Sequence, residues 1–309
     1  MSARAMFRMA AFGALVALAA CDVPPPPPPT PIETPESKAP TPQETALGRY
    51  YQGVQARLLA QGLLRTDGGG PDTPFGPRDL ARNFERIALY DEYQLENGRF
   101  VQRETKSTLR RWEKPVRIVP IFGRSVPDDQ RAQDADNLRA YARRLSDLTR
   151  HPISVASAGG NYFVLFLTAD ELAASGATLR ALLPGIDSDT VAEITRLPRT
   201  TYCSVYAFSD PGSGGAYSAA VAVIRAEHPD LLRLSCIHEE IAQGLGLAND
   251  SPRARPSIFN DDEEFALLTR MDELMLRILY DRRLHVGMTP EEARPIVERI
   301  ADELMGATG

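Results

Sequence analysis

The order of apolar and amphipathic segments between residues 116 and 247 restricts this chain to folds in which helices pack against a sheet. Uninterrupted apolar runs predict buried strands, and apolar residues at three- and four-residue spacing predict helices. Strands are expected at 116–122, 162–167, 202–208 and 216–225, and helices at 128–149, from 169 and at 231–247. Because strands and helices alternate, we expect an α/β (α+β) fold with a mixed sheet.

Further patterns flank this region on both sides. A helix is expected at 46–64, a short helix followed by a strand at 79–89, and a hairpin at 90–105 that turns at Asn97-Gly98. Downstream, helices are expected at 265–279 and 290–305, the second capped by Thr289. We therefore divide the body into an N-terminal helical and hairpin subdomain, 46–110, and a larger domain, 111–309.

The first twenty residues have the organisation of an export signal. Arg4 and Arg8 precede an apolar run, 9–20, that contains no acidic residue. This run is shorter than the roughly 20 residues that a membrane-spanning helix needs, so a signal peptide is expected. The run ends in Leu-Ala-Ala before Cys21 and resembles the bacterial lipobox. Cleavage before Cys21 and attachment of lipid, including palmitate, to its thiol are therefore predicted. The alternative is ordinary cleavage beside a chance cysteine.

Residues 21–45 are expected to form a disordered tether. They include six consecutive prolines and almost no apolar residue, so the segment cannot bury a core and should stay extended. The lipid would hold the protein on the periplasmic face of a membrane. Asp22, which follows the lipidated cysteine, resembles an inner-membrane retention signal, so the inner membrane is slightly favoured.

Charge and cysteine content narrow the partners and the compartment. The chain carries a net charge of −6. Removal of the leader takes away two arginines and no acid, so the mature chain is more acidic and a nucleic-acid partner is not expected. Apart from Cys21, the chain contains Cys203 and Cys236 alone. In an oxidising periplasm two such cysteines form a disulfide, with two buried free thiols as the alternative.

The predicted helix at 231–247 contains the clearest chemical pattern. Glu239 and Gln243 are four residues apart and therefore share one helix face. Gly246 can end the helix in a left-handed conformation, after which Asn249 or Asp250 can fold back towards it. The competing interpretation of these residues is a solvated helix face with a capped end.

This spacing resembles the extended zinc-binding motif of metzincin peptidases, H-E-x-x-H-x-x-G-x-x-H/D. Glu239, Gln243 and Asn249 occupy the three ligand positions, Gly246 matches the glycine, and Glu240 matches the general-base glutamate. The resemblance implies a zincin-like mixed sheet with a motif helix and C-terminal helices. All three ligand positions lack histidine, and zinc prefers imidazole or thiolate ligands, so a standard zinc site is not expected.

The chain is also similar to the proteobacterial lipoprotein family known as domain of unknown function 2927. The similarity covers roughly residues 112–288 and rests on His238, Glu239, Glu240, Gln243, Leu245, Gly246, Leu247, Asn249 and Asp250, and on 257–262 and 265–273. No activity can be carried over from that family.

Three functions follow as hypotheses. The first is a membrane-anchored binding or scaffold module for a peptide or a cell-envelope protein. The second is an atypical metal-dependent hydrolase, with Glu240 as general base and a divalent metal ion held by Glu239, Gln243, Asn249 or Asp250, with His238 as a further ligand. The third is a purely structural lipoprotein. A second acidic cluster, 260–264, could join Asp250 in binding a hard cation, or could be an exposed turn that caps the next helix.

Overall fold

The computed structural model describes residues 41–96, 99–260 and 262–306; for residue 42 and for 91–104 it describes the backbone only. The leader, Cys21, most of the tether, the Asn97-Gly98 turn and Asp261 lie outside the described residues. Within these ranges, no helix is both long and apolar enough to cross a bilayer.

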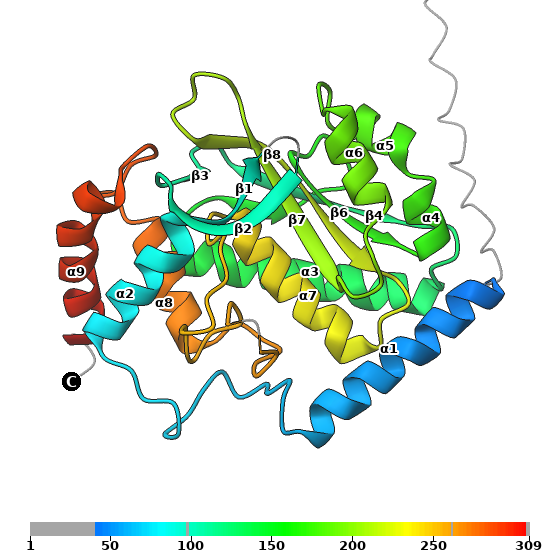
Figure 1. The fold of residues 1–309 in the computed structure, drawn as a ribbon, viewed down its shortest axis with the longest axis horizontal. Helices are drawn as coiled ribbons and strands as arrows, with labels where there is room; N and C mark the ends of the chain where they lie inside the picture. Colours follow the sequence, from blue (N-terminus) through cyan, green and yellow to red (C-terminus); the bar gives the residue numbers. More distant parts are fainter. Residues whose placement is uncertain (1–40, 97–98, 261, 307–309) are drawn as a thin grey trace, which may run out of the picture. The chain divides into compact units, whose positions relative to one another are not determined.

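The main sheet is mixed, and its strands agree with the apolar runs of the sequence (Figure 1). Its strands are β3 (Arg111–Trp112), β4 (Val116–Phe122), β5 (Ile153–Val155), β6 (Tyr162–Leu167), β7 (Cys203–Ser209) and β8 (Ala216–Arg225). Strands β5, β4, β6 and β8 lie side by side and are parallel. β7 pairs antiparallel with β8, and among the described strands it has no other partner. β7 is therefore an edge strand.

Helices cover both faces of this sheet, because its central strands alternate between two apolar cores. All six residues of β6 are buried. Val164 and Phe166 point to a core that includes α3 (Asp128–Thr149) and α7 (Asp230–Gly244). Leu165 and Phe163 point to a second core, closed by α4 (Ala169–Ala173), α5 (Gly176–Leu182) and α6 (Ser188–Thr195). Figure 1 shows these two groups of helices on opposite sides of the strands.

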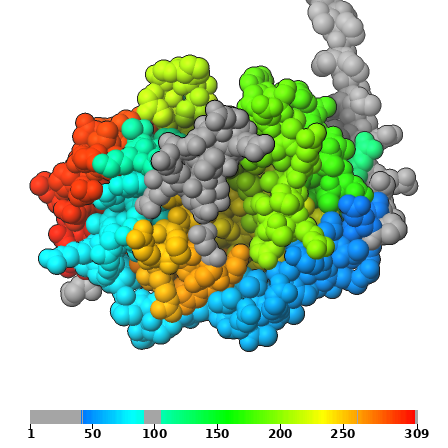
Figure 2. Space-filling view, in the orientation of Figure 1, coloured from blue at the N-terminus to red at the C-terminus, as the bar shows by residue number. Residues whose placement is uncertain are grey.

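The remaining elements extend the first core or border it. They are α1 (Pro42–Ala60), α2 (Pro77–Ala88), α8 (Arg270–Leu279), α9 (Pro290–Gly306) and a separate antiparallel hairpin of β1 (Tyr90–Glu96) and β2 (Arg99–Lys106). α2 packs against α8 and α9 (Figure 1). The described residues between 41 and 306 form one compact unit (Figure 2).

The α/β (α+β) class and most elements were predicted correctly, but the helix expected at 265–279 begins later. Thr269 is its N-cap, accepting a hydrogen bond from the backbone N–H of Asp272, so α8 starts at Arg270. Phe265 instead makes a parallel bridge with Arg65, in the loop after α1. A contact between segments so distant in sequence has no local signal. The helix expected at 46–64 also shifts towards the N-terminus, because Thr41 and Glu44 form a capping box there.

Candidate functional site

Helix α7 carries the motif, and a glycine fixes the point where the chain leaves it. Gly246 has φ +126°, a conformation that favours glycine. A Cβ atom at this position would lie 2.3 Å from the backbone oxygen of Arg110. The glycine of the motif therefore allows close approach of the chain that leads into β3, and it directs the following residues back along α7.

The N-terminal half of α7 is tied to its neighbours by a covalent bond and by buried charges. Cys236 forms a disulfide with Cys203 of β7, which confirms the predicted pair. Nε of Arg233 donates to both carboxylate oxygens of Asp134 on α3, each at 2.8 Å, and both side chains are buried. A buried, charge-assisted contact of this kind, with one N–H shared between two carboxylate oxygens, fixes the rotation of α7 against α3. The next turn of α7 is thus held in a defined orientation beside β7.

His238 lies on the side of α7 that faces α3 and α8. Its Nδ1 accepts a hydrogen bond from the backbone N–H of Leu268 at 3.1 Å, and its ring stacks on that of Tyr141 with a centroid distance of 4.0 Å. Burial, with a smaller effect of Arg144, lowers the pKa of His238 to about 3. The neutral ring therefore acts as a hydrogen-bond acceptor inside the core, away from the acidic residues of the motif.

Glu240 is buried, with 3% of its surface exposed. Burial raises the pKa of its carboxyl well above the ordinary value, and the nearby charge of Asp250 raises it further. Its Oε2 is enclosed without a hydrogen-bond partner. Burial favours the protonated, neutral form of such a carboxyl, because the ionised form would be poorly solvated. Glu240 can thus present a proton and an unsatisfied oxygen to a bound group.

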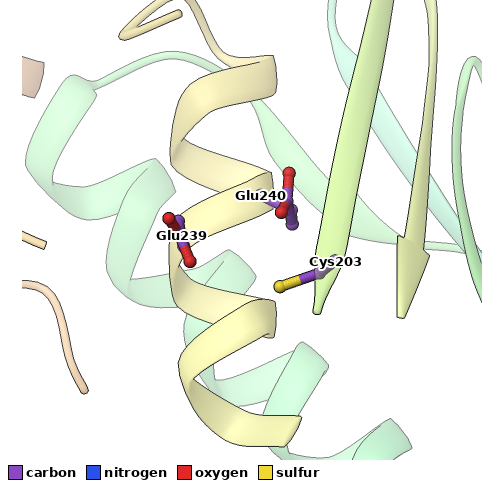
Figure 3. Close-up of side chains that lie close together, drawn as sticks. All are labelled: Cys203, Glu239 and Glu240. Carbon is purple, nitrogen blue, oxygen red and sulfur yellow. The ribbon is translucent and has the colours of Figure 1, made fainter. Parts of the chain in front are cut away.

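Glu239 and Glu240 converge near the start of β7 (Figure 3). One carboxylate oxygen of each and the Sγ of Cys203 all lie within 4.8 Å of one another. Cys203 is in the disulfide, so its sulfur is not available as a thiolate ligand. The convergence therefore leaves two carboxyl groups, of which Glu239 is half-buried and Glu240 is buried.

The remaining motif residues separate into two groups. Nε2 of Gln243 donates to Oδ1 of Asp250 at 3.0 Å, so these two predicted site residues lie together beside Glu240. Asn249 is bound elsewhere: its side-chain amide donates to the backbone oxygen of Arg86, and its backbone N–H donates to that of Ile87, both at 3.0 Å. Asn249 therefore joins the loop after α7 to α2.

These donors do not fit a zinc ion. The imidazole of His238 is hydrogen-bonded and stacked in the core, and the amide of Gln243 already contacts Asp250. What remains near Glu239 is oxygen, and burial raises the pKa of the second carboxyl, that of Glu240, which disfavours its ionised form. Zinc sites in proteins are built from imidazole, thiolate and ionised carboxylate, so a hydrolytic step through zinc has no support in this arrangement.

The second acidic cluster is occupied by arginines and turn hydrogen bonds. The carboxylate of Glu264 contacts Arg65 and Arg255. Asp262 accepts from the backbone N–H of Glu264 at 2.9 Å. No described contact joins these residues to Asp250, so the cation site expected there stays a prediction.

The tyrosines that support the motif helix were not found by sequence reasoning. The hydroxyl of Tyr162 donates to the backbone oxygen of Glu240 at 2.7 Å, and that of Tyr141 donates to the backbone oxygen of His238 at 2.8 Å. These residues are 78 and 97 positions from their partners, so no local spacing connects them. The signal available was an aromatic residue in a predicted buried strand or helix face, since buried tyrosine hydroxyls usually find an acceptor.

Comparison with known proteins gave one match. Residues 77–299 match the family described as "Protein of unknown function (DUF2927)". The matched segment begins at α2 and ends within α9, so it includes the main sheet and the whole of α7. No curated protein and no solved structure matches the chain.

Proposed function

Since the chain belongs to the DUF2927 family of proteins of unknown function, we propose a function from its own site: a membrane-tethered binding module of the cell envelope. The binding surface is the polar face of α7 together with edge strand β7, referred to below as the α7/β7 face. Its occupant is a peptide segment of a periplasmic or envelope protein, which is bound and not cleaved. The domain corresponds to a zincin-like scaffold without its zinc ligands.

The observation that carries this proposal is what the residues at the three ligand positions of the motif contact. Gln243 is hydrogen-bonded to Asp250, Asn249 is hydrogen-bonded to the backbone of α2, and only Glu239 keeps a carboxylate near the motif glutamate. The mixed sheet, with an antiparallel edge strand against the motif helix, agrees with the zincin-like architecture that the resemblance implies.

The chemistry of the α7/β7 face suits an extended peptide. An edge strand presents backbone N–H and C=O groups that can pair with another chain. The carboxyl of Glu240 lies between α7 and β7, and its enclosed Oε2 has no hydrogen-bond partner among the described residues. A peptide on β7 would supply the strand pairing, and a polar side chain of that peptide inserted between α7 and β7 would supply the missing donor.

The metal-dependent hydrolase is the second candidate, and the convergence of Glu239 and Glu240 favours it. Two carboxylates can hold a hard cation such as Ca²⁺ or Mg²⁺ once both are ionised. In that case Glu240 would lose its proton on binding the ion, and binding would strengthen as pH rises.

Metal content separates the two candidates. We expect the full chain, purified without chelator, to contain far less than one divalent ion per chain by elemental analysis. A stoichiometric ion that disappears in Glu239→Gln would establish the hydrolase candidate in place of the binding module. Glu298→Gln is the matched control, since it removes an exposed carboxylate on α9.

Binding is tested by site-specific photo-crosslinking in cells. A crosslinker at Ser209, the exposed end of β7, should give a discrete adduct with an envelope protein. The same group at Leu59, an exposed residue of α1, serves as the control. Equal or absent adducts at both positions would refute the α7/β7 face as the binding surface.

The tether is part of the proposal and rests on the sequence alone. Lipid on Cys21 would hold the domain at the periplasmic face of a membrane, with the inner membrane favoured by Asp22. We expect incorporation of labelled palmitate and recovery of the chain with membranes. Cys21→Ser should abolish the label and release the chain, whereas retained label would show that another residue is modified.

A further inference from the structure

A second groove lies between α2 and α9, separate from the α7/β7 face. Its volume is about 830 Å³, within the range of small-molecule sites. Figure 1 shows the two helices packed side by side. Three arginines of α2, at positions 78, 82 and 86, line it at four-residue intervals, one on each turn. Their guanidinium groups therefore follow one another along a single wall.

The other sides of the groove add two more arginines and an apolar floor. Arg294 comes from α9, and Arg253 comes from the loop that follows α7. Ala81, Leu89 and Val297 also line the groove and are buried. These apolar residues do not compete with a ligand for hydrogen bonds from the arginines. The guanidinium groups line the same groove, which is open to solvent.

Carboxylates offset part of this charge. Glu85 pairs with Arg294, Arg82 pairs with Asp79, and Glu298 and Asp302 lie on the α9 wall. Five arginines against the three lining carboxylates and Asp79 still leave an excess of one positive charge at the groove, on a chain whose net charge is −6. Exposed ion pairs are weak, with typical strengths of about 0.2–1 kcal/mol, so a ligand can replace them.

We propose that this groove binds a small anionic ligand that carries two or more phosphate groups or a phosphate with a carboxylate. The planar guanidinium group forms paired hydrogen bonds with both kinds of anion. The spacing of the α2 arginines, about 6 Å along the helix axis for each four residues, suits groups joined by a short linker and not a single ion. Tyr90, which also lines the groove, can contact an apolar or ring portion of the ligand.

The test uses the full chain and inorganic pyrophosphate as the probe, measured by isothermal titration calorimetry. We expect saturable binding that weakens as salt is raised, because the contacts are exposed and screened. The double variant Arg78→Gln/Arg82→Gln should lower the affinity at least about tenfold. Arg299→Gln removes an exposed arginine of α9 that does not line the groove, and it should leave the affinity unchanged.

Two results would overturn the proposal: no saturable heat at millimolar pyrophosphate, or an equal loss of affinity in the Arg299→Gln control. If the double variant failed to fold, Arg294→Gln would test the opposite wall independently. A further arm separates the source of the phosphate. Recruitment of the Cys21→Ser chain to vesicles that contain cardiolipin, whose headgroup carries two phosphates, would identify a lipid headgroup if the double variant loses it. Pyrophosphate binding without recruitment would identify a soluble ligand.

Discussion

Two buried carboxyl groups, Asp272 on α8 and Glu240 on α7, differ in how the protein satisfies them. Asp272 accepts four hydrogen bonds, from the hydroxyls of Ser257 and Thr269 and from the backbone N–H groups of Ile258 and Thr269. Those bonds oppose the effect of burial, so its pKa rises only to about 6. Glu240 has an oxygen without a partner, and its pKa rises well above the ordinary range.

The difference separates a structural carboxyl from one available for binding. Asp272 caps α8 and holds the segment at 257–258 against it, and every hydrogen bond described for it is internal. Glu240 has the same depth of burial without the compensating donors. An unsatisfied buried polar atom is unfavourable, and proteins keep such groups mainly where a ligand or a partner satisfies them. The difference supports the proposal that α7 carries the binding residues, whereas the carboxyl of α8 stabilises the fold.

The largest expected effect concerns the disulfide that positions Glu240. Cys203→Ser/Cys236→Ser removes a crosslink between residues 33 positions apart, which corresponds to about 4 kcal/mol of lost stability in the chain-entropy treatment. Urea unfolding in the Cys21→Ser background measures it, with Cys21→Ser alone as the control. A loss below about 1 kcal/mol would mean that packing alone fixes α7 against β7.

Asp272→Asn should destabilise the protein by about 3 kcal/mol at pH 4–5, because an amide nitrogen would face donors that now bind the carboxyl oxygens. The loss should shrink as pH rises from about 4 to about 6. In that window the folded wild type binds the proton of Asp272 more tightly than the unfolded chain does. The stability that Asp272 contributes to the wild type therefore declines as pH rises through its folded pKa of about 6. Asp302→Asn, on an exposed face of α9, is the control. A pH-independent loss would contradict the raised pKa of Asp272.

Glu240→Gln should show a pH dependence of the same direction as Asp272→Asn, because the pKa of both carboxyls is raised by burial. The pKa of Glu240 is raised in the folded state, so wild-type stability is greatest below the unfolded value near 4.5 and falls as pH rises above it. The amide does not titrate. The stability of the Glu240→Gln variant relative to wild type should therefore improve between pH 5 and pH 8. The improvement should be about 1.4 kcal/mol for each pH unit between the unfolded and the folded pKa of Glu240 that falls in this range. A constant difference would show that Glu240 is ionised in the folded protein.

Gln243→Ala should have the smallest effect, below about 1 kcal/mol. It removes one hydrogen bond to Asp250 at a half-buried position, where water can replace the donor. The same variant should reduce crosslinking from Ser209, since Asp250 would lose its fixed position. If the variant lost several kcal/mol and bound normally, Gln243 would belong with Asp272 as a structural group.

Some features of the fold and of the site could be predicted from the sequence, and others could not. The apolar run at 162–167, and the run at 116–122 that only Arg117 interrupts, define their strands to the residue, because mostly apolar runs need burial on both sheet faces. The cap at Thr168 and the turn of Gly246 also follow from local chemistry. The start of α8 also has a local signal, the capping box of Thr269 and Asp272. The pairing of Phe265 with a loop two hundred residues earlier in the chain has none.

By itself, the sequence determined the layered α/β class, the helix that carries the motif, and the cysteine pair, since strand burial, helical spacing and cysteine number are local or countable properties. Only the tertiary structure decided what each polar residue does. His238 is hydrogen-bonded to the backbone just before α8, and Asn249 is hydrogen-bonded to the backbone of α2. Glu239 and Glu240, in contrast, converge at β7. The physical reason is that a hydrogen-bond partner and the degree of burial depend on segments that are distant in sequence, and these two quantities separate a structural side chain from one that can bind a ligand.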